Sequence, residues 1–176
     1  TGRYVLEESK ESLILRRQGR IQYAGESITA TLEKQILLAP DESALEIRYD
    51  ITREGDWPVD LWFGVEFAVN LLTGSAPDRY YWSEDTNLGR AMLGVRESND
   101  SLHHLAVRDD WQRLESSWRF SLPARVHRFA LETVSQSEGG QERVHQGCVV
   151  LPCWRLAETA ENGRFSLTIR WETSLV

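Results

Sequence analysis

Apolar side chains recur at every second position over much of this chain, which is the period of a strand with one buried face. The longest run covers residues 61–72, and shorter runs cover 45–51, 114–120 and 165–171. Turn segments rich in Gly, Pro, Asn and Asp separate the runs, and their spacing predicts roughly ten to fourteen strands. Only at 31–38 does the alternation lapse, so a short helix is predicted there.

So many strands favour a layered architecture, because a sheet of that size normally divides into two packed sheets. The hydrophobic fraction of 41% beside 27% charged residues is that of an ordinary globular domain. We therefore expect residues 1–176 to form one all-β domain, a two-sheet antiparallel β-sandwich.

The overall composition argues against two classes of partner. A net charge of −7 does not provide the clustered Lys and Arg of a nucleic-acid surface, and the sequence has no run of about 18 apolar residues to span a membrane. The sequence starts at Thr1 without an initiator Met or a signal-peptide pattern, so we expect a piece of a longer, cytoplasmic polypeptide. Cys148 and Cys153 fall on opposite faces of a strand, and two free thiols suit a reducing compartment.

Acidic clusters give a weak calcium signal. Asp109 and Asp110 end one predicted strand and Asp78 lies in a turn, and either group could join Glu66 or Glu138 as oxygen ligands. The spacing matches no EF-hand loop, and ion pairs with Arg are the commoner use of such residues. We therefore expect neither a metal nor another cofactor.

The second face of the 61–72 run carries groups that suit a polar ligand. Trp62, Glu66 and Asn70 share this face, and Gly64 leaves room for a ligand or a neighbouring backbone. Indole rings stack on sugar rings while carboxylates and amides bind hydroxyls, so carbohydrate is one reading. The alternative is a plainly solvated face.

Residues 132–147, here called the polar hairpin, concentrate more hydrogen-bonding side chains than a turn between two strands requires. The segment has polar groups on both arms around Gly139 and Gly140. It predicts a carbohydrate-binding site or a docking surface, with the candidate residues Glu132, Gln136, Glu138, Glu142, Arg143 and His145.

Catalytic motifs are absent from the sequence. It contains none of the Gly-x-Ser-x-Gly, His-Glu-x-x-His, Gly-x-Gly-x-x-Gly or P-loop patterns. Two carboxylates across a glycosidic bond could hydrolyse it, and Glu66, Glu132, Glu138 and Glu142 are available, but sequence alone gives no distances.

Two stretches of the chain resemble a known family. The first stretch is 129–147 with 149–154, and it includes the run Ser135-Gln136-Ser137-Glu138-Gly139-Gly140. The second stretch is 63–67 with 70–72 and 76–81, and these segments follow one another in the same order as in the family's domain. Together they look like the C-terminal β-sandwich of family-57 glycoside hydrolases, the 4-α-glucanotransferase and α-amylase type.

The resemblance implies a galactose-mutarotase-like β-sandwich belonging to an α-1,4-glucan-processing enzyme. In such enzymes the catalytic residues lie in an N-terminal (β/α) barrel, so no residue of this chain inherits a catalytic role. The implied partners are that barrel, in the same polypeptide, and an α-glucan or maltooligosaccharide.

Three functions therefore compete. The chain is a non-catalytic domain that assists carbohydrate binding, or it is a structural module whose polar hairpin docks on the barrel. The third is an aldose epimerase, which would use Glu138 or Glu66 as base with His145 as acid.

Overall fold

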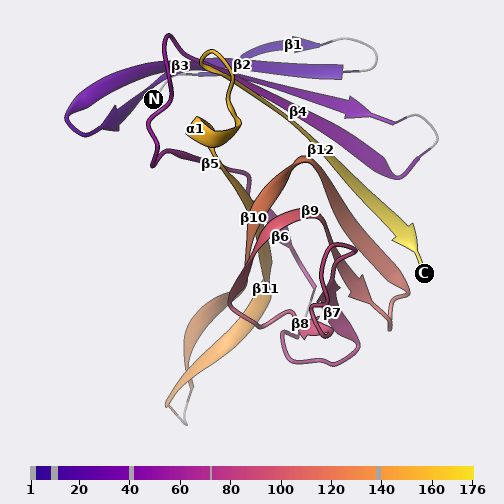
Figure 1. Cartoon of the computed structure of the whole chain (residues 1–176). Coiled ribbons are helices and arrows are strands. Elements are labelled where there is room, and N and C mark those ends of the chain that lie inside the picture. Colours follow the sequence, from indigo (N-terminus) through magenta and orange to yellow (C-terminus); the bar gives the residue numbers. More distant parts are fainter. Residues whose placement is uncertain (1–2, 9–11, 40–41, 72, 138–139) are drawn as a thin grey trace. The chain divides into compact units, whose positions relative to one another are not determined.

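The computed structural model describes residues 3–8, 12–39, 42–71, 73–137 and 140–176. Within them lie twelve strands and a single helical turn, and the strand pairings are antiparallel (Figure 1). The elements are β1 Val5–Glu8, β2 Ser12–Tyr23, β3 Glu26–Leu38, β4 Ala44–Thr52, β5 Trp62–Gly64, β6 Phe67–Val69, β7 Arg79–Trp82, β8 Ala91–Met92, β9 Glu97–Asp109, β10 Leu114–Ser137, β11 Gly140–Arg155, α1 Leu156–Thr159 and β12 Arg164–Leu175. The predicted all-β, antiparallel class is confirmed.

The chain divides into two compact units, and each is described by itself. Unit 1 comprises Thr1–Phe63, Arg119–Leu122 and Trp154–Glu172, and unit 2 comprises Gly64–Trp118, Pro123–Cys153 and Thr173–Val176.

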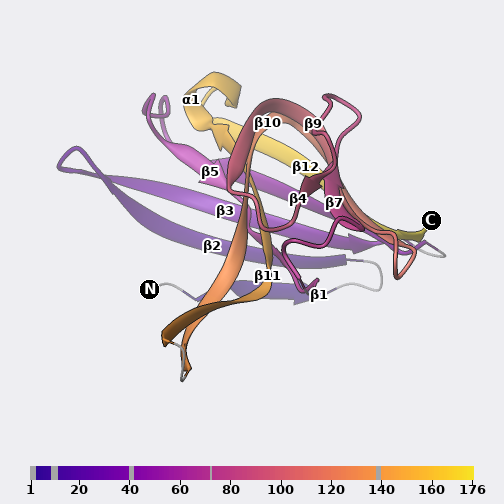
Figure 2. The same cartoon turned by 90° about the horizontal axis from the view of Figure 1, so that it is seen from below.

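Unit 1 is built on the strand order β1-β2-β3-β4-β12. Figure 2 shows the long strands β2, β3 and β4 side by side. Alternate residues of β4 and β12 are buried, among them Ile47, Tyr49 and Phe165, and the Tyr49 ring meets Phe63 edge-on at 5.3 Å between centroids. This face is the core that the period-two pattern predicted.

The predicted helix at 31–38 is wrong, because these residues belong to β3 and pair with β2 and β4 on both sides. The alternation does continue: Leu32 and Ile36 share a face with Lys34. The Lys34 ammonium lies 5.6 Å from the centre of the Tyr49 ring, so a cation–π contact replaces the expected apolar side chain. Burial lowers the pKa of Lys34, as this position implies.

The run at 61–72 alternates in exposure as predicted, from half-buried Leu61 to half-buried Leu71. It is not one strand, however, because β5 and β6 are separate. Val65 donates its N–H to the Pro152 carbonyl on β11 at 3.1 Å, and Pro152 has no N–H to return. The ladder is therefore interrupted at this point.

Unit 2 has a core of its own, to which β6, β7, β9, β10 and β11 contribute side chains. Its fully buried side chains include Trp118, Tyr81, Leu105, Val126 and Val149. Cys148 is buried and Cys153 half-buried, and both are free thiols. No helix in the described part of the chain has the length and apolar character to cross a membrane.

Candidate functional site

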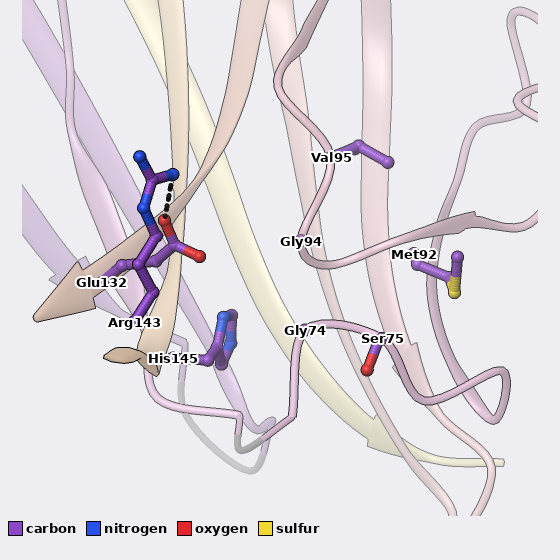
Figure 3. Close-up of a pocket in the computed structure, with 8 residues that line it drawn as sticks. All are labelled: Gly74, Ser75, Met92, Gly94, Val95, Glu132, Arg143 and His145. Atoms are coloured by element: carbon purple, nitrogen blue, oxygen red, sulfur yellow. Dashed lines mark ion pairs between the residues drawn. The ribbon is translucent and has the colours of Figure 1, made fainter. Parts of the chain in front are cut away.

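A pocket of about 360 Å³ lies in unit 2 beside the polar hairpin (Figure 3). We call it the hairpin pocket, and the residues that line it are Gly74, Ser75, Met92, Gly94, Val95, Glu132, Arg143 and His145. Three of these, Glu132, Arg143 and His145, were predicted as site residues.

One wall comes from the paired strands β10 and β11. Glu132 lies opposite His145 and Val134 opposite Arg143, and partners in an antiparallel pair face the same side. A register shift between Leu131 and Glu132 marks a bulge at the base of this wall, and bulges re-aim side chains. The sequence thus places a carboxylate, a guanidinium and an imidazole on one face.

The two charged side chains of this wall form a long, exposed ion pair. Arg143 Nη1 lies 3.6 Å from Glu132 Oε2, and the Arg143 side chain is 77% exposed (Figure 3). Such an exposed pair contributes at most about 1 kcal/mol to stability. Both side chains therefore remain available to an incoming polar group.

The opposite wall depends on two glycines in close contact. Gly94 donates its N–H to the Gly74 carbonyl at 2.7 Å, and a Cβ on Gly94 would lie 2.9 Å from that oxygen. A Cβ on Gly74 would lie 2.8 Å from His145 Nδ1. Larger residues at either position would push the two walls apart.

His145 is fixed against this wall. Its Nε2 lies 3.2 Å from the Leu71 carbonyl, which can only accept, so Nε2 is the donor in this contact, and Nδ1 lies on the side of Gly74. The described residues place no carboxylate within hydrogen-bond reach of the ring. This arrangement suits positioning and binding better than acid–base catalysis.

The other predicted site residues that the structure describes do not line this pocket, and they lie on different faces and segments of the chain. Gln136 shares the exposed face of Glu132, whereas Glu142 pairs with Ser135 on the opposite face, and Glu138 lies outside the described residues. The Asn70 side chain reaches the backbone of Gly147, where a Cβ would lie 3.0 Å from its Oδ1.

The two remaining candidates do not line the hairpin pocket. Trp62 is 38% exposed, with the Arg155 guanidinium 5.0 Å from its ring centre. Glu66 is exposed between β5 and β6. An epimerase pairing of Glu66 with His145 therefore finds no support in the geometry of unit 2, and the pairing with Glu138 is outside the described residues.

Of the acidic clusters, Asp109 and Asp110 are engaged in ion pairs, whereas Asp78 Oδ1 is buried with no hydrogen-bond partner among the described residues. Asp109 accepts from Arg79 Nε at 2.7 Å, and Asp110 lies within 3 Å of both Arg90 and Arg108. Among the described residues no group of three His, Cys, Asp or Glu could hold a metal ion.

Sequence reasoning missed a buried arginine in unit 2. Arg128 is fully buried, and its Nη2 donates to Asn99 Oδ1 at 2.7 Å and to Glu97 Oε2 at 3.0 Å. Its guanidinium carbon lies 5.0 Å from the centre of the Tyr81 ring. Burial lowers the pKa of Arg128, although Glu97 opposes the shift. The sequence did contain a sign of this burial, because Arg128 follows Val126 by two residues and therefore lies on the same, core-facing side of β10.

Comparison with known proteins identifies the family. The family model described as "Alpha-amylase/4-alpha-glucanotransferase, C-terminal" matches residues 1–169. Alpha-amylase 1 of Dictyoglomus thermophilum is 27% identical over 137 residues, which are 78% of this chain and 19% of that protein. The chain thus spans about a fifth of that relative's length.

Solved structures establish the fold. The 4-α-glucanotransferase of Thermococcus litoralis matches 96% of this chain with 22% of its own, at a TM-score of 0.70 and 22% identity. The aldose epimerase homologue of C. elegans matches 98% of this chain with 69% of its own, at a TM-score of 0.59 and 12% identity. The predicted galactose-mutarotase-like fold is confirmed, and the chain belongs to the family of C-terminal domains of α-amylases and 4-α-glucanotransferases.

Proposed function

We propose that this chain is a non-catalytic domain of a cytoplasmic α-1,4-glucan-processing enzyme, and that it braces the rest of that polypeptide through the polar hairpin. The observation that carries the proposal is the exposure of both faces of the hairpin. Residues 132–136 and 140–144 are exposed throughout. Val134 is 64% exposed on one face and Val144 is 39% exposed on the other.

This exposure is costly for a free hairpin. An isolated two-stranded ribbon is marginally stable in water. Its exposed valines do not contribute to stability, because apolar side chains stabilise a fold only when they are removed from water. In both views β10 and β11 run side by side to the hairpin end (Figures 1 and 2). A partner that covers either face would bury apolar surface and fix the strands.

The occupant that we assign to this surface is the remainder of the same polypeptide. The chain corresponds to about a fifth of the α-amylase that it matches, so most of such a protein lies outside these residues. Glu142 on one face and Arg143 on the other offer charges of both signs for inter-domain pairs.

The double variant Val134→Asp/Val144→Asp tests the brace. In the full-length polypeptide we expect it to lower the free energy of unfolding by about 1–3 kcal/mol, because two buried interface contacts are replaced by desolvated charges. In the 176-residue chain alone the valines are already exposed, so the loss should stay within about 0.5 kcal/mol. Thermal and urea unfolding of both proteins measure the difference.

The matched control is Val59→Asp, which alters a valine of unit 1 that is 67% exposed. It should be neutral in both proteins. Equal losses from the hairpin variant in the isolated and full-length proteins would contradict the brace.

Glucan contact at the hairpin pocket is a second candidate, supported by the convergence of Glu132, Arg143 and His145. A carboxylate and a guanidinium on one wall can bind sugar hydroxyls, while Met92 and Val95 offer apolar contact. The described lining of this pocket contains no Phe, Tyr or Trp side chain on which a sugar ring could stack, so we expect weak binding.

For this candidate, Glu132→Gln should weaken maltoheptaose binding to the 176-residue chain by about three- to tenfold, through loss of a charged acceptor. Amide NMR titration followed at Gly74, Gly94 and His145 measures it. The control Glu142→Gln, on the opposite face, should leave the affinity unchanged; shifts that are equal in both variants would dismiss the pocket.

A further inference from the structure

A second concave surface lies in unit 1, on the solvent side of strands β2, β3 and β4. It has a volume of about 660 Å³, within the range of pockets that hold a ligand of several rings. We call it the sheet groove, and its lining residues are Gln18, Glu26, Ser27, Ile28, Thr29, Thr31, Thr52, Arg53 and Glu54.

Strand register arranges the polar groups of the groove in a row. Gln18 lies opposite Thr31, and Thr31 lies opposite Thr52, so the three side chains face the same side across three adjacent strands. Figure 2 shows these strands side by side. Two strand spacings give the row a length of about 10 Å.

The next row of the same sheet face is different, because its members bind each other. Arg16 donates to Glu33 at 2.6 Å, and Asp50 accepts from Ser166 at 2.6 Å. Arg164, which lies opposite Thr52 at the end of the groove row, also donates to Asp50, at 2.7 Å. By contrast, the side chains of Gln18, Thr31 and Thr52 make no hydrogen bond to another described residue. The row Gln18–Thr31–Thr52 is therefore flanked by paired side chains, with Arg16 and Glu33 on one side and, at the far end of the groove, Gln22, which donates to Ser27 at 3.3 Å.

The charges of the groove restrict the ligand. Glu26 and Glu54 supply two carboxylates, against one guanidinium from Arg53. The Arg53 Nε already donates to the Glu54 carbonyl at 2.9 Å, and its guanidinium lies over the Trp57 ring at 5.7 Å. The lining therefore has no cluster of cations to bind a phosphorylated or carboxylated ligand.

The uncharged groups define what fits instead. Threonine hydroxyls and the Gln18 amide both donate and accept hydrogen bonds, which matches a ligand whose own groups do the same. We propose that the sheet groove binds a neutral oligosaccharide through the row Gln18–Thr31–Thr52. Its assignment as an α-glucan rests on the proposed function, whereas the preference for a neutral polyhydroxylated chain rests on the groove itself.

The test uses the 176-residue chain with maltoheptaose as the probe, followed by amide NMR and calorimetry. The double variant Thr31→Val/Thr52→Val removes two hydroxyls and keeps strand-favouring, similarly shaped side chains. We expect it to weaken maltoheptaose binding about tenfold or more, with wild-type shifts concentrated at Thr29, Thr31 and Thr52. The matched control is Thr168→Val, which alters the same sheet face outside the groove and should leave the affinity unchanged.

Each outcome decides between the proposals. Shifts at Gly74, Gly94 and His145 without shifts in β3 and β4 would overturn the sheet groove and favour the hairpin pocket. Tighter binding of glucose 6-phosphate than of maltoheptaose would overturn the preference for a neutral ligand. No shift with maltoheptaose or cellohexaose at about 10 mM would reject oligosaccharide binding altogether, and it would leave the brace unaffected because that is measured by unfolding of the full-length polypeptide.

Discussion

The double variant Glu97→Ala/Asn99→Ala should lower the free energy of unfolding by about 3–5 kcal/mol, the cost of leaving a buried charge without its acceptors. Arg128 is fully buried, and these two side chains accept from its Nη2. Its Nε and Nη1 have no hydrogen-bond partner among the described residues, so little else compensates the charge. Urea unfolding monitored by tryptophan fluorescence measures the loss.

Two further variants distinguish the loss of the Arg128 acceptors from the general effect of shortening side chains. Ser98→Ala, at an exposed neighbouring position, should stay within about 0.5 kcal/mol of wild type. Arg128→Met in the double-variant background should restore much of the stability, because an apolar side chain of similar length removes the stranded charge. A double variant that loses less than about 1 kcal/mol would show that Arg128 does not depend on these acceptors.

Asp109→Asn should cost about 2–4 kcal/mol near pH 7, and the difference should close as the pH falls below about 4. Asp109 is 1% exposed, and it accepts from the Gln112 N–H at 2.9 Å and from Arg79 Nε at 2.7 Å. Burial by itself raises the pKa of Asp109, but these hydrogen bonds and the Arg79 charge outweigh burial and hold it below its ordinary value.

The direction of the pH effect follows from that pKa. A carboxyl whose folded pKa lies below its unfolded pKa of 3.8 stabilises the fold above that value, and the contribution disappears as pH falls through the folded pKa. Unfolding free energies measured from about pH 7 to pH 2 should therefore converge for wild type and variant at the acid end. Asp110→Asn is the neighbouring control: its carboxylate makes exposed ion pairs with Arg90 and Arg108 and accepts a long, exposed hydrogen bond from the Tyr80 hydroxyl at 3.5 Å, so a loss below about 1 kcal/mol is expected.

The strands were predictable from sequence because their signal is local. Period-two alternation at 45–51 and 165–171 depends only on which face is buried, and both runs are paired strands with that face in the core. The 31–38 segment failed because Lys34 occupies an apolar position, and the ring of Tyr49 that accommodates it belongs to another strand. The break near Val65 likewise depends on Pro152, a distant residue that no local pattern connects to it.

The candidate site was predictable for one wall only. Glu132, Arg143 and His145 come from a single hairpin, whose arms pair from Ser137 opposite Gly140 onward. The second wall needs the approach of Gly74 to Gly94, two turn glycines whose contact is decided by packing. The sheet groove was missed for the same reason, since Gln18, Thr31 and Thr52 become a row only when three strands take their register.

The threading of the chain through its two units sets the order in which it can fold during synthesis. Strand β4 ends at Thr52, yet its other partner β12 begins only at Arg164, after most of unit 2 has been translated. Until then the nascent chain presents an open strand edge beside the apolar side chains of Ile47 and Ile51. Unit 1 is therefore completed only after β12 has been synthesised, and until that stage a chaperone that shields β4 should improve the yield of native protein.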